Sequence, residues 1–153
     1  MTPKASASPT IVVHGIPAPQ GSKRHVGGGR MIESSKAVGP WREAIRGSVL
    51  ATFGQVTPLE GPLSVDVTFV FDRPRSHYGT GRNSRIVRPL APVFPATRPD
   101  LDKLCRALFD ALTDAHVWHD DGQVVRLVAF KRWADDKIWS DPGAVIHITD
   151  VPA

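Results

Sequence analysis

The feature that most constrains the fold is one apolar stripe between residues 101 and 112. Apolar side chains recur there at intervals of three and four residues, which is the period of an α-helix with one buried face. The stripe consists of Leu101, Leu104, Cys105, Leu108, Phe109 and Leu112. Asp100 is a suitable N-cap residue, and Pro99 stands just before it. The pattern predicts an amphipathic helix that begins directly after Asp100.

Other periodic segments predict the rest of the domain. Apolar residues alternate with polar ones through residues 63–71, which is typical of a strand with one buried face. The predicted strands are residues 10–16, 63–71, 123–133 and 143–151. A first helix is predicted from Pro40, with Trp41, Ile45 and Val49 on one stripe. The order strand, helix, strand, helix, strand, strand predicts an α+β domain with a mixed sheet and two helices.

Length and composition favour one ordinary globular domain. The chain has 153 residues, of which 41% are hydrophobic and 22% are charged. We expect residues 1–9 to be disordered, residues 10–153 to form a single domain, and residues 25–31 to form a flexible loop or a hairpin tip. The single cysteine, Cys105, is expected to be a buried structural thiol. No apolar run is long enough for a membrane span and the N-terminus lacks a signal pattern, so a cytoplasmic location is expected.

Charge is unevenly distributed along the chain. The formal net charge is +4, yet residues 73–98 contain six arginines and no acid, while residues 100–121 contain six aspartates. A basic loop of this length is expected either to bind a polyanion or to be a solvated insertion.

The aspartates at the two ends of the predicted helix suggest a metal site. At an N-cap the chain is still extended, so the carboxylates of Asp100 and Asp102 can converge beyond the helix end. If the next strand begins beside that end, Asp121 joins them, and a divalent cation such as Mg²⁺ would relieve the repulsion among three carboxylates. The alternative is structural: Asp100 caps the helix, Asp102 interacts with its dipole, and Asp120 and Asp121 occupy a turn.

The stretch from Arg98 to Lys131 closely resembles the central signature of the RusA family of Holliday junction resolvases. The matching positions are Asp100, Leu101, Asp102, Phe109, Asp110, Ala111, Leu112, Trp118, Asp120, Asp121, Gln123, Val124 and Val125. The segment "GIPAPQGSKR" also resembles the opening of phage-type members. The resemblance implies a homodimeric endonuclease that depends on Mg²⁺, for which Mn²⁺ can substitute, and that nicks four-way DNA junctions symmetrically.

By position, the resemblance assigns catalysis and metal binding to Asp100, Asp102 and Asp121. Two departures stand out: the family's helix lysine aligns with Arg106, and its usual asparagine aligns with Lys103. Arginine binds phosphate through two donors but does not act as a general acid, so Arg106 is expected to stabilise charge on the phosphate and Lys103 to supply an ammonium group. Their alternatives are an ion pair between Arg106 and Asp102 and a solvated surface lysine.

The remaining basic residues are expected to grip the DNA backbone around the acidic pocket. The expected DNA contacts are Lys23, Arg24, Arg30, Arg73, Arg75, Arg82, Arg85, Arg88, Arg98 and Lys131. Two other functions stay open at this point: a non-catalytic junction-binding protein, and a nuclease that acts on flaps or forks.

Overall fold

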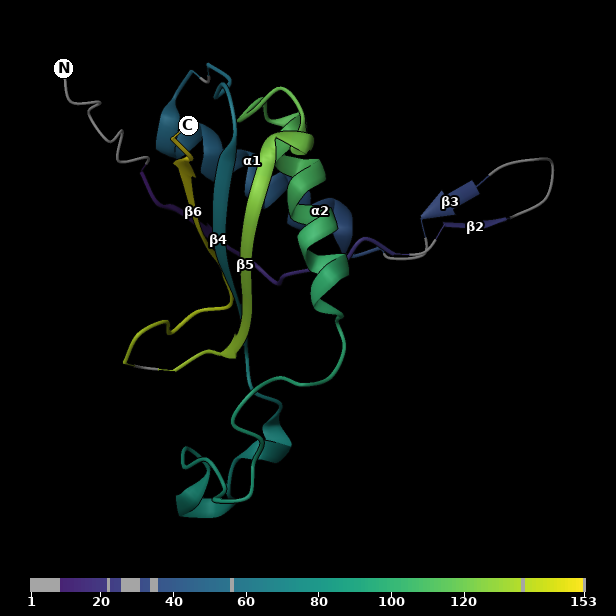
Figure 1. The fold of residues 1–153 in the computed structure, drawn as a ribbon. Helices are drawn as coiled ribbons and strands as arrows, with labels where there is room; N and C mark the ends of the chain where they lie inside the picture. The colour runs from purple at the N-terminus through teal and green to yellow at the C-terminus, as the bar shows by residue number, and fades with distance from the viewer. Residues whose placement is uncertain are drawn as a thin grey trace.

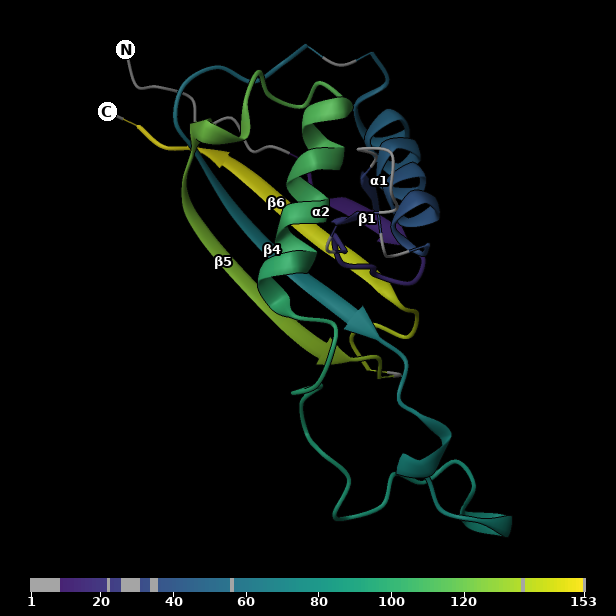
Figure 2. The same ribbon diagram turned by 90° about the vertical axis from the view of Figure 1, so that its right-hand side faces the viewer.

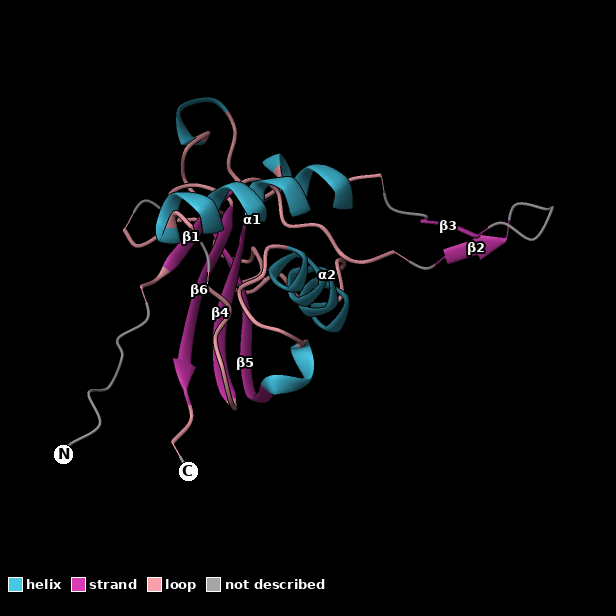
Figure 3. Ribbon diagram, turned by 90° about the horizontal axis from the view of Figure 1, so that it is seen from above, coloured by secondary structure: helices cyan, strands magenta, loops and turns pink. Residues whose placement is uncertain are grey.

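Two helices lie on one face of a four-stranded sheet in the computed structural model of the chain (Figures 1 and 3). The structure describes residues 9–21, 23–25, 31–33, 36–55, 57–135 and 137–152. The strands of the sheet are β1 (Ile11–His14), β4 (Leu63–Phe71), β5 (Val124–Trp133) and β6 (Gly143–Asp150). The helices are α1 (Val38–Phe53) and α2 (Leu101–Asp114). The predicted α+β class with two helices is confirmed.

The sheet is mixed, as predicted, and its strand order is β1-β6-β4-β5. β4 and β5 are parallel, whereas the other neighbours are antiparallel. Two parallel neighbours need a long crossover, and α2 provides it. Because only a short turn separates α2 from β5, β5 begins near the C-terminal end of α2 and runs back toward the N-terminal end (Figure 2).

The core lies between the helices and the sheet. The predicted stripe of α2 is buried there, and Leu104, Leu108 and Leu112 have no exposed surface. Facing side chains come from α1, β1, β4 and β6, including Trp41, Ile45, Ile11, Val65, Val67, Phe69 and Ile146. Each aliphatic side chain buried in this way stabilises the fold by about 1.5–3 kcal/mol. These contacts fix α2 on the sheet and so fix both of its ends.

Two features differ from the predicted order. A separate hairpin pairs β2 (Lys23–His25) with β3 (Met31–Glu33), and it adds two strands that the periodic pattern did not indicate. The expected hairpin tip itself, residues 26–30, lies outside the described residues, as do residues 1–8 of the expected disordered segment. Residues 73–98 contain two short 3-10 helices, η1 (Arg75–His77) and η2 (Gly81–Asn83). No helix in the described ranges is long and apolar enough to cross a membrane.

Candidate active site

The N-terminus of α2 presents two carboxylates. Asp100 occupies the N-cap position in an extended conformation, but its side chain makes no capping hydrogen bond. Its Oδ2 atom instead lies 3.9 Å from Nζ of Lys103. Asp102 stands in the first turn and is exposed. The predicted start of the helix is therefore confirmed, whereas the predicted capping role of the Asp100 side chain is not realised.

Lys131, near the end of β5, holds the backbone that leads into α2. Its Nζ atom donates hydrogen bonds to the carbonyl oxygens of Thr97, at 2.5 Å, and Pro99, at 2.6 Å. Partial burial lowers the pKa of Lys131, and the nearby charge of Asp100 opposes that shift. Lysine at this position was expected to contact DNA, but its ammonium group is already committed to two carbonyl oxygens of the chain. Its direct structural effect is to fix the approach to Asp100.

A cleft of about 540 Å³ opens beside these residues. One wall is the segment 94–98, and the other includes Phe130 and Lys131 of β5. Asp100, Leu101 and Arg98 also line the cleft. Phe94 and Phe130 meet edge to face, with ring centroids 5.6 Å apart. The cleft thus combines a carboxylate, a cation and an apolar wall, which suits a ligand with both charged and apolar parts.

The third predicted carboxylate, Asp121, lies in a different part of the molecule. It begins the short 3-10 helix η3 (Asp121–Gln123), which follows the turn after α2. Hydrogen bonds between side chains and backbone amides fix this turn. Oδ1 of Asp120 accepts a hydrogen bond from the Gly122 amide at 3.1 Å. Oε1 of Gln123 accepts from the amides of His119 and Asp120. This reciprocal arrangement is a capping box, so the predicted turn role of Asp120 is confirmed.

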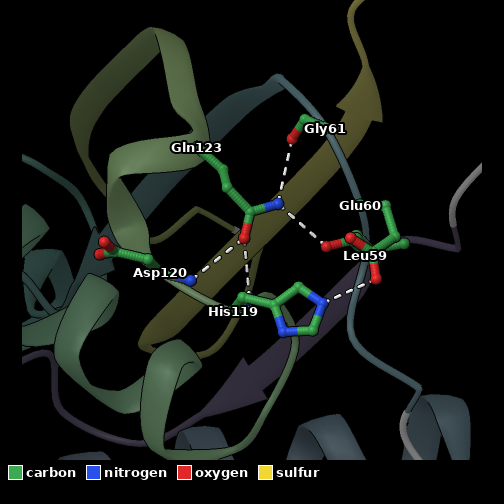
Figure 4. A network of polar contacts seen from close by, with 6 residues as sticks. All are labelled: Leu59, Glu60, Gly61, His119, Asp120 and Gln123. Atoms are coloured by element: carbon green, nitrogen blue, oxygen red, sulfur yellow. Dashed lines mark hydrogen bonds and ion pairs between the residues drawn. The ribbon is translucent and has the colours of Figure 1, made fainter.

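Gln123 ties the same turn to the segment before β4 (Figure 4). Its Nε2 atom donates to the carbonyl oxygens of Leu59, at 2.9 Å, and Gly61, at 3.0 Å. Nearby, Nε2 of His119 lies 2.7 Å from Oε1 of Glu60. His119 therefore has a carboxylate as its partner.

The pKa values of the neighbouring residues Asp120 and Asp121 shift in opposite directions. The side-chain hydrogen bond with Asp120, partial desolvation and the charges of Asp120 and Asp110 all raise the pKa of Asp121. The amide of Gly122, followed by the bond to Asp121, lowers the pKa of Asp120. η3, which Asp121 begins, packs against α2, and Asp110 of α2 is the helix residue whose charge contributes to the raised pKa.

Asp121 therefore lies apart from Asp100 and Asp102 within one chain. Fourteen residues separate the ends of α2, which is about 21 Å of helix at the usual rise. No group of three or more His, Cys, Asp or Glu side chains within the described ranges is arranged to hold a metal ion. The expectation that the three carboxylates converge in one chain is wrong, because β5 begins beside the C-terminal end of α2 and not beside its N-terminus.

The other predicted site residues are spread around the cleft and the loop before it. Arg106 is exposed on α2, and it forms no ion pair with Asp102 in the described part of the chain, so that structural alternative is not realised. Arg73, Arg75 and Arg88 donate to backbone carbonyls, whereas Arg82, Arg85 and Arg98 are exposed. The side chains of Lys23 and Arg24, and the whole of Arg30, lie outside the described residues.

Sequence reasoning missed the aromatic wall of the cleft. Phe94 stands in a stretch without periodicity, and Phe130 ends a largely apolar run in a predicted strand, so neither position indicated a shared surface. Only the return of segment 94–99 across the end of β5 brings the two rings together. The positions of Arg106 and of the two carboxylates at the start of α2, by contrast, could be predicted from the sequence.

Comparison with known protein families identifies a match. A family model described as "Endodeoxyribonuclease RusA" matches residues 14–149. No curated protein matches the chain. The matched range includes both helices, the cleft and η3. It also includes the whole sheet apart from the first three residues of β1 and the last residue of β6.

Proposed function

The chain belongs to the RusA family of endodeoxyribonucleases, which are Holliday junction resolvases that hydrolyse phosphodiester bonds of DNA, and on that premise we propose how this chain does so. It resolves four-way junctions by symmetric cuts, with Mg²⁺ as the preferred ion and Mn²⁺ as a substitute. The observation that carries the proposal is the pair of exposed carboxylates at the N-terminal end of α2, Asp100, which lines the cleft, and Asp102, within a matched family domain.

The donor atoms of this pair suit a hard divalent cation. Carboxylate oxygens are the ligands that Mg²⁺ prefers, and neither carboxylate is consumed in capping the helix. Asp100 and Asp102 would hold the ion together with a third carboxylate. When bound, the ion supplies charge stabilisation at the scissile phosphate and lowers the pKa of water at the site. The remaining steps belong to the side chains of the chain itself.

The third carboxylate is proposed to come from a second copy of the chain. β5 is an edge strand, and three of its large apolar side chains are exposed: Val125 by 61%, Leu127 by 41% and Val128 by 45%. An exposed apolar edge strand is a surface for pairing with another strand. Two β5 strands paired antiparallel about a two-fold axis near Arg126 bring the partner subunit's Asp121 toward Lys131, because both residues are five positions from the axis.

Such a dimer has two identical sites, each built from both subunits. The N-terminal end of α2 in one copy would meet η3 of the other, so carboxylates that lie apart within one chain would lie close together between chains. A four-way junction also has approximate two-fold symmetry. The dimer therefore presents its two sites to opposing strands, which is what symmetric cutting requires.

The cations near the pair are proposed to bind the phosphate. Arg106 lies one helical turn beyond Asp102, and its exposed guanidinium can donate two hydrogen bonds to a phosphate. Lys103, already 3.9 Å from Asp100, adds a second positive charge at the same end of the helix. Arg98, which lines the cleft, and the arginines of residues 73–88 hold flanking phosphates. These contacts position DNA without reading its sequence and weaken as salt rises.

Cleavage of synthetic four-way, flap and linear duplex substrates tests this function. We expect the wild type to cut four-way junctions with Mg²⁺ and not with chelator, and Asp102→Asn to bind the junction without cutting it. Asp141→Asn, which removes an exposed carboxylate elsewhere, is the matched control and keeps activity. Binding without any cleavage by the wild type would favour the non-catalytic junction-binding function. Preferential cutting of flaps would favour the other alternative.

A further inference from the structure

Residues 73–93 form an arm that extends beyond the end of the sheet (Figures 1 and 2). The arm leaves β4, passes through η1 and η2, and returns toward the cleft. It is anchored at its base by Trp133, whose Nε1 atom donates to the carbonyl oxygen of Pro92 at 3.1 Å. Arg73 donates to the same oxygen at 2.8 Å, and its guanidinium lies 5.5 Å from the centre of the Trp133 ring.

Internal hydrogen bonds give the arm a fixed shape. An antiparallel bridge joins Tyr78 to Val87, and the amide of Gly79 donates to the carbonyl oxygen of Ile86 at 2.9 Å. Arg88 donates to the carbonyl oxygen of Tyr78 through its side chain at 2.7 Å. Arg75 bonds the carbonyl oxygen of Ser84 in the same manner at 2.8 Å. A loop fixed in this way presents the same surface to every ligand.

The arm has positive charges that no carboxylate neutralises. It contains five arginines and no acid, and none of the five forms an ion pair within the described part of the chain. Three of them bond to carbonyl oxygens, which are neutral acceptors, so each guanidinium keeps its full charge. The surface of the arm therefore attracts anions more strongly than a surface whose arginines are paired.

The same arm exposes large apolar side chains. Leu90 is 98% exposed, Val93 is 73% exposed and Ile86 is 59% exposed. Leu90 lies within a tight turn that closes with a hydrogen bond from the Ala91 amide to the carbonyl oxygen of Arg88 at 3.0 Å. Isolated exposed leucines are common, but three such side chains on one fixed and strongly cationic segment indicate a binding surface.

We propose that the arm inserts Leu90 and its apolar neighbours among the bases at the branch point of a DNA junction, while its arginines bind the adjoining phosphates. This inference rests on the proposed function and adds the element that selects branched DNA. Proteins that insert an apolar side chain between bases must unstack them. At a branch point the stacking is already interrupted, so insertion there costs less than in a continuous duplex, and the arm favours the junction.

A second copy of the chain is the competing occupant of this surface. Charge argues against it, since the arm carries five positive charges, and the whole chain has a net charge of +4. Bringing two such surfaces together is unfavourable, whereas the phosphates around a branch point complement them. The two arginines of β5 are paired with carboxylates, Arg126 with Asp66 and Arg132 with Asp135, so β5 remains the proposed surface for the second copy.

Fluorescence of 2-aminopurine at the branch point tests the proposal. The base is brighter when unstacked, so binding of Asp102→Asn protein to a labelled four-way junction without metal is expected to raise the signal. Adding Leu90→Ser is expected to abolish the rise and to weaken junction binding about tenfold, the effect of losing burial of one leucine. Binding to linear duplex is expected to change less than twofold. Leu90→Met, which stays apolar, is expected to restore the signal.

The matched control is Leu50→Ser on α1, where another leucine is 55% exposed far from the arm in sequence; it should leave the signal intact. Equal signals and equal junction affinities for Leu90→Ser and its parent would overturn the proposal. A change of oligomeric state caused by Leu90→Ser, measured by light scattering, would also overturn it and assign the arm to the second copy. Cleavage of unlabelled junctions by wild type reports separately on the proposed function.

Discussion

The ammonium group of Lys131 lies 2.6 Å from the carbonyl oxygen of Pro99 and so joins the end of β5 to the residue before Asp100. A second bond, to the carbonyl oxygen of Thr97, completes the attachment. Lys131 is therefore a positioning residue for the proposed metal ligand Asp100. It acts through the backbone and needs no contact with the substrate.

Replacing Lys131 by alanine is expected to change the Mg²⁺ dependence of cleavage more than the stability of the fold. We expect the Mg²⁺ concentration for half-maximal cleavage to rise, because Asp100 is no longer held in place, while unfolding in urea shows a loss of about 1–3 kcal/mol for hydrogen bonds from a charged donor. Lys137→Ala, an exposed lysine change, is the control. An unaltered Mg²⁺ dependence in Lys131→Ala would show that Lys131 does not position Asp100.

Mixing two inactive variants tests whether each site is shared between subunits. Asp102→Asn and Asp121→Asn are each expected to be inactive, but their mixed dimer contains one site with all three carboxylates intact. Nicking of one junction strand should therefore return on mixing. The control mixture of Asp100→Asn with Asp102→Asn has no intact site and should stay inactive. Failure of the first mixture to regain activity, with subunit exchange verified, would place the site in one chain.

A charge on the free edge of β5 is expected to separate the subunits. Val125→Asp replaces an apolar side chain that is 61% exposed, so the folded monomer tolerates it, but a paired strand would bury the new carboxylate. Light scattering should show a monomer, and junction cleavage should be lost. Val12→Asp places the same charge on β1, the opposite edge strand, and should leave the dimer intact. A dimer that survives Val125→Asp would place the interface elsewhere.

Arg106 and Lys103 are expected to contribute unequally to cleavage. Arg106→Ala should lower the cleavage rate far more than the affinity for a junction, because its proposed contact is with the scissile phosphate. Lys103→Ala should have a smaller effect, because its ammonium group already interacts with Asp100 at 3.9 Å. Single-turnover rates and binding measured separately will distinguish the two. Equal rates for Arg106→Ala and wild type would remove Arg106 from the site.

Cys105 is expected to make stability depend on alkaline pH. Burial, and then the charge of Asp102, raises the pKa of this thiol to about 11 from 9.0. Because the folded state keeps the proton longer, the stabilisation is fully present below pH 9 and is lost as the pH rises from about 9 to about 11. Urea unfolding across this range should show the loss, and Cys105→Ala should lack it. A wild-type slope identical to that of Cys105→Ala would contradict the shift.

Local patterns were sufficient to predict most of the fold. The stripe on α2 and the alternation in β4 follow from the spacing of side chains that have to be buried, and such spacing is visible in any window of the sequence. The predicted burial of Cys105 is confirmed for the same reason. A hairpin tip at residues 25–31 was one of two expectations, but β2 and β3 themselves were not predicted, because strands of three residues are too short to show a period.

The candidate site shows where sequence alone stops. The sequence determined where α2 begins, and it predicted which carboxylates carry chemistry, because a helix start and a family signature are properties of consecutive residues. Only the tertiary structure decided that Asp121 lies beyond the opposite end of α2, that Lys131 holds the backbone before Asp100, and that Phe94 meets Phe130. The physical reason is that α2 connects two parallel strands, so β5 begins near the C-terminal end of the helix. This arrangement depends on pairing between β4 and β5, whose residues are far apart in the chain.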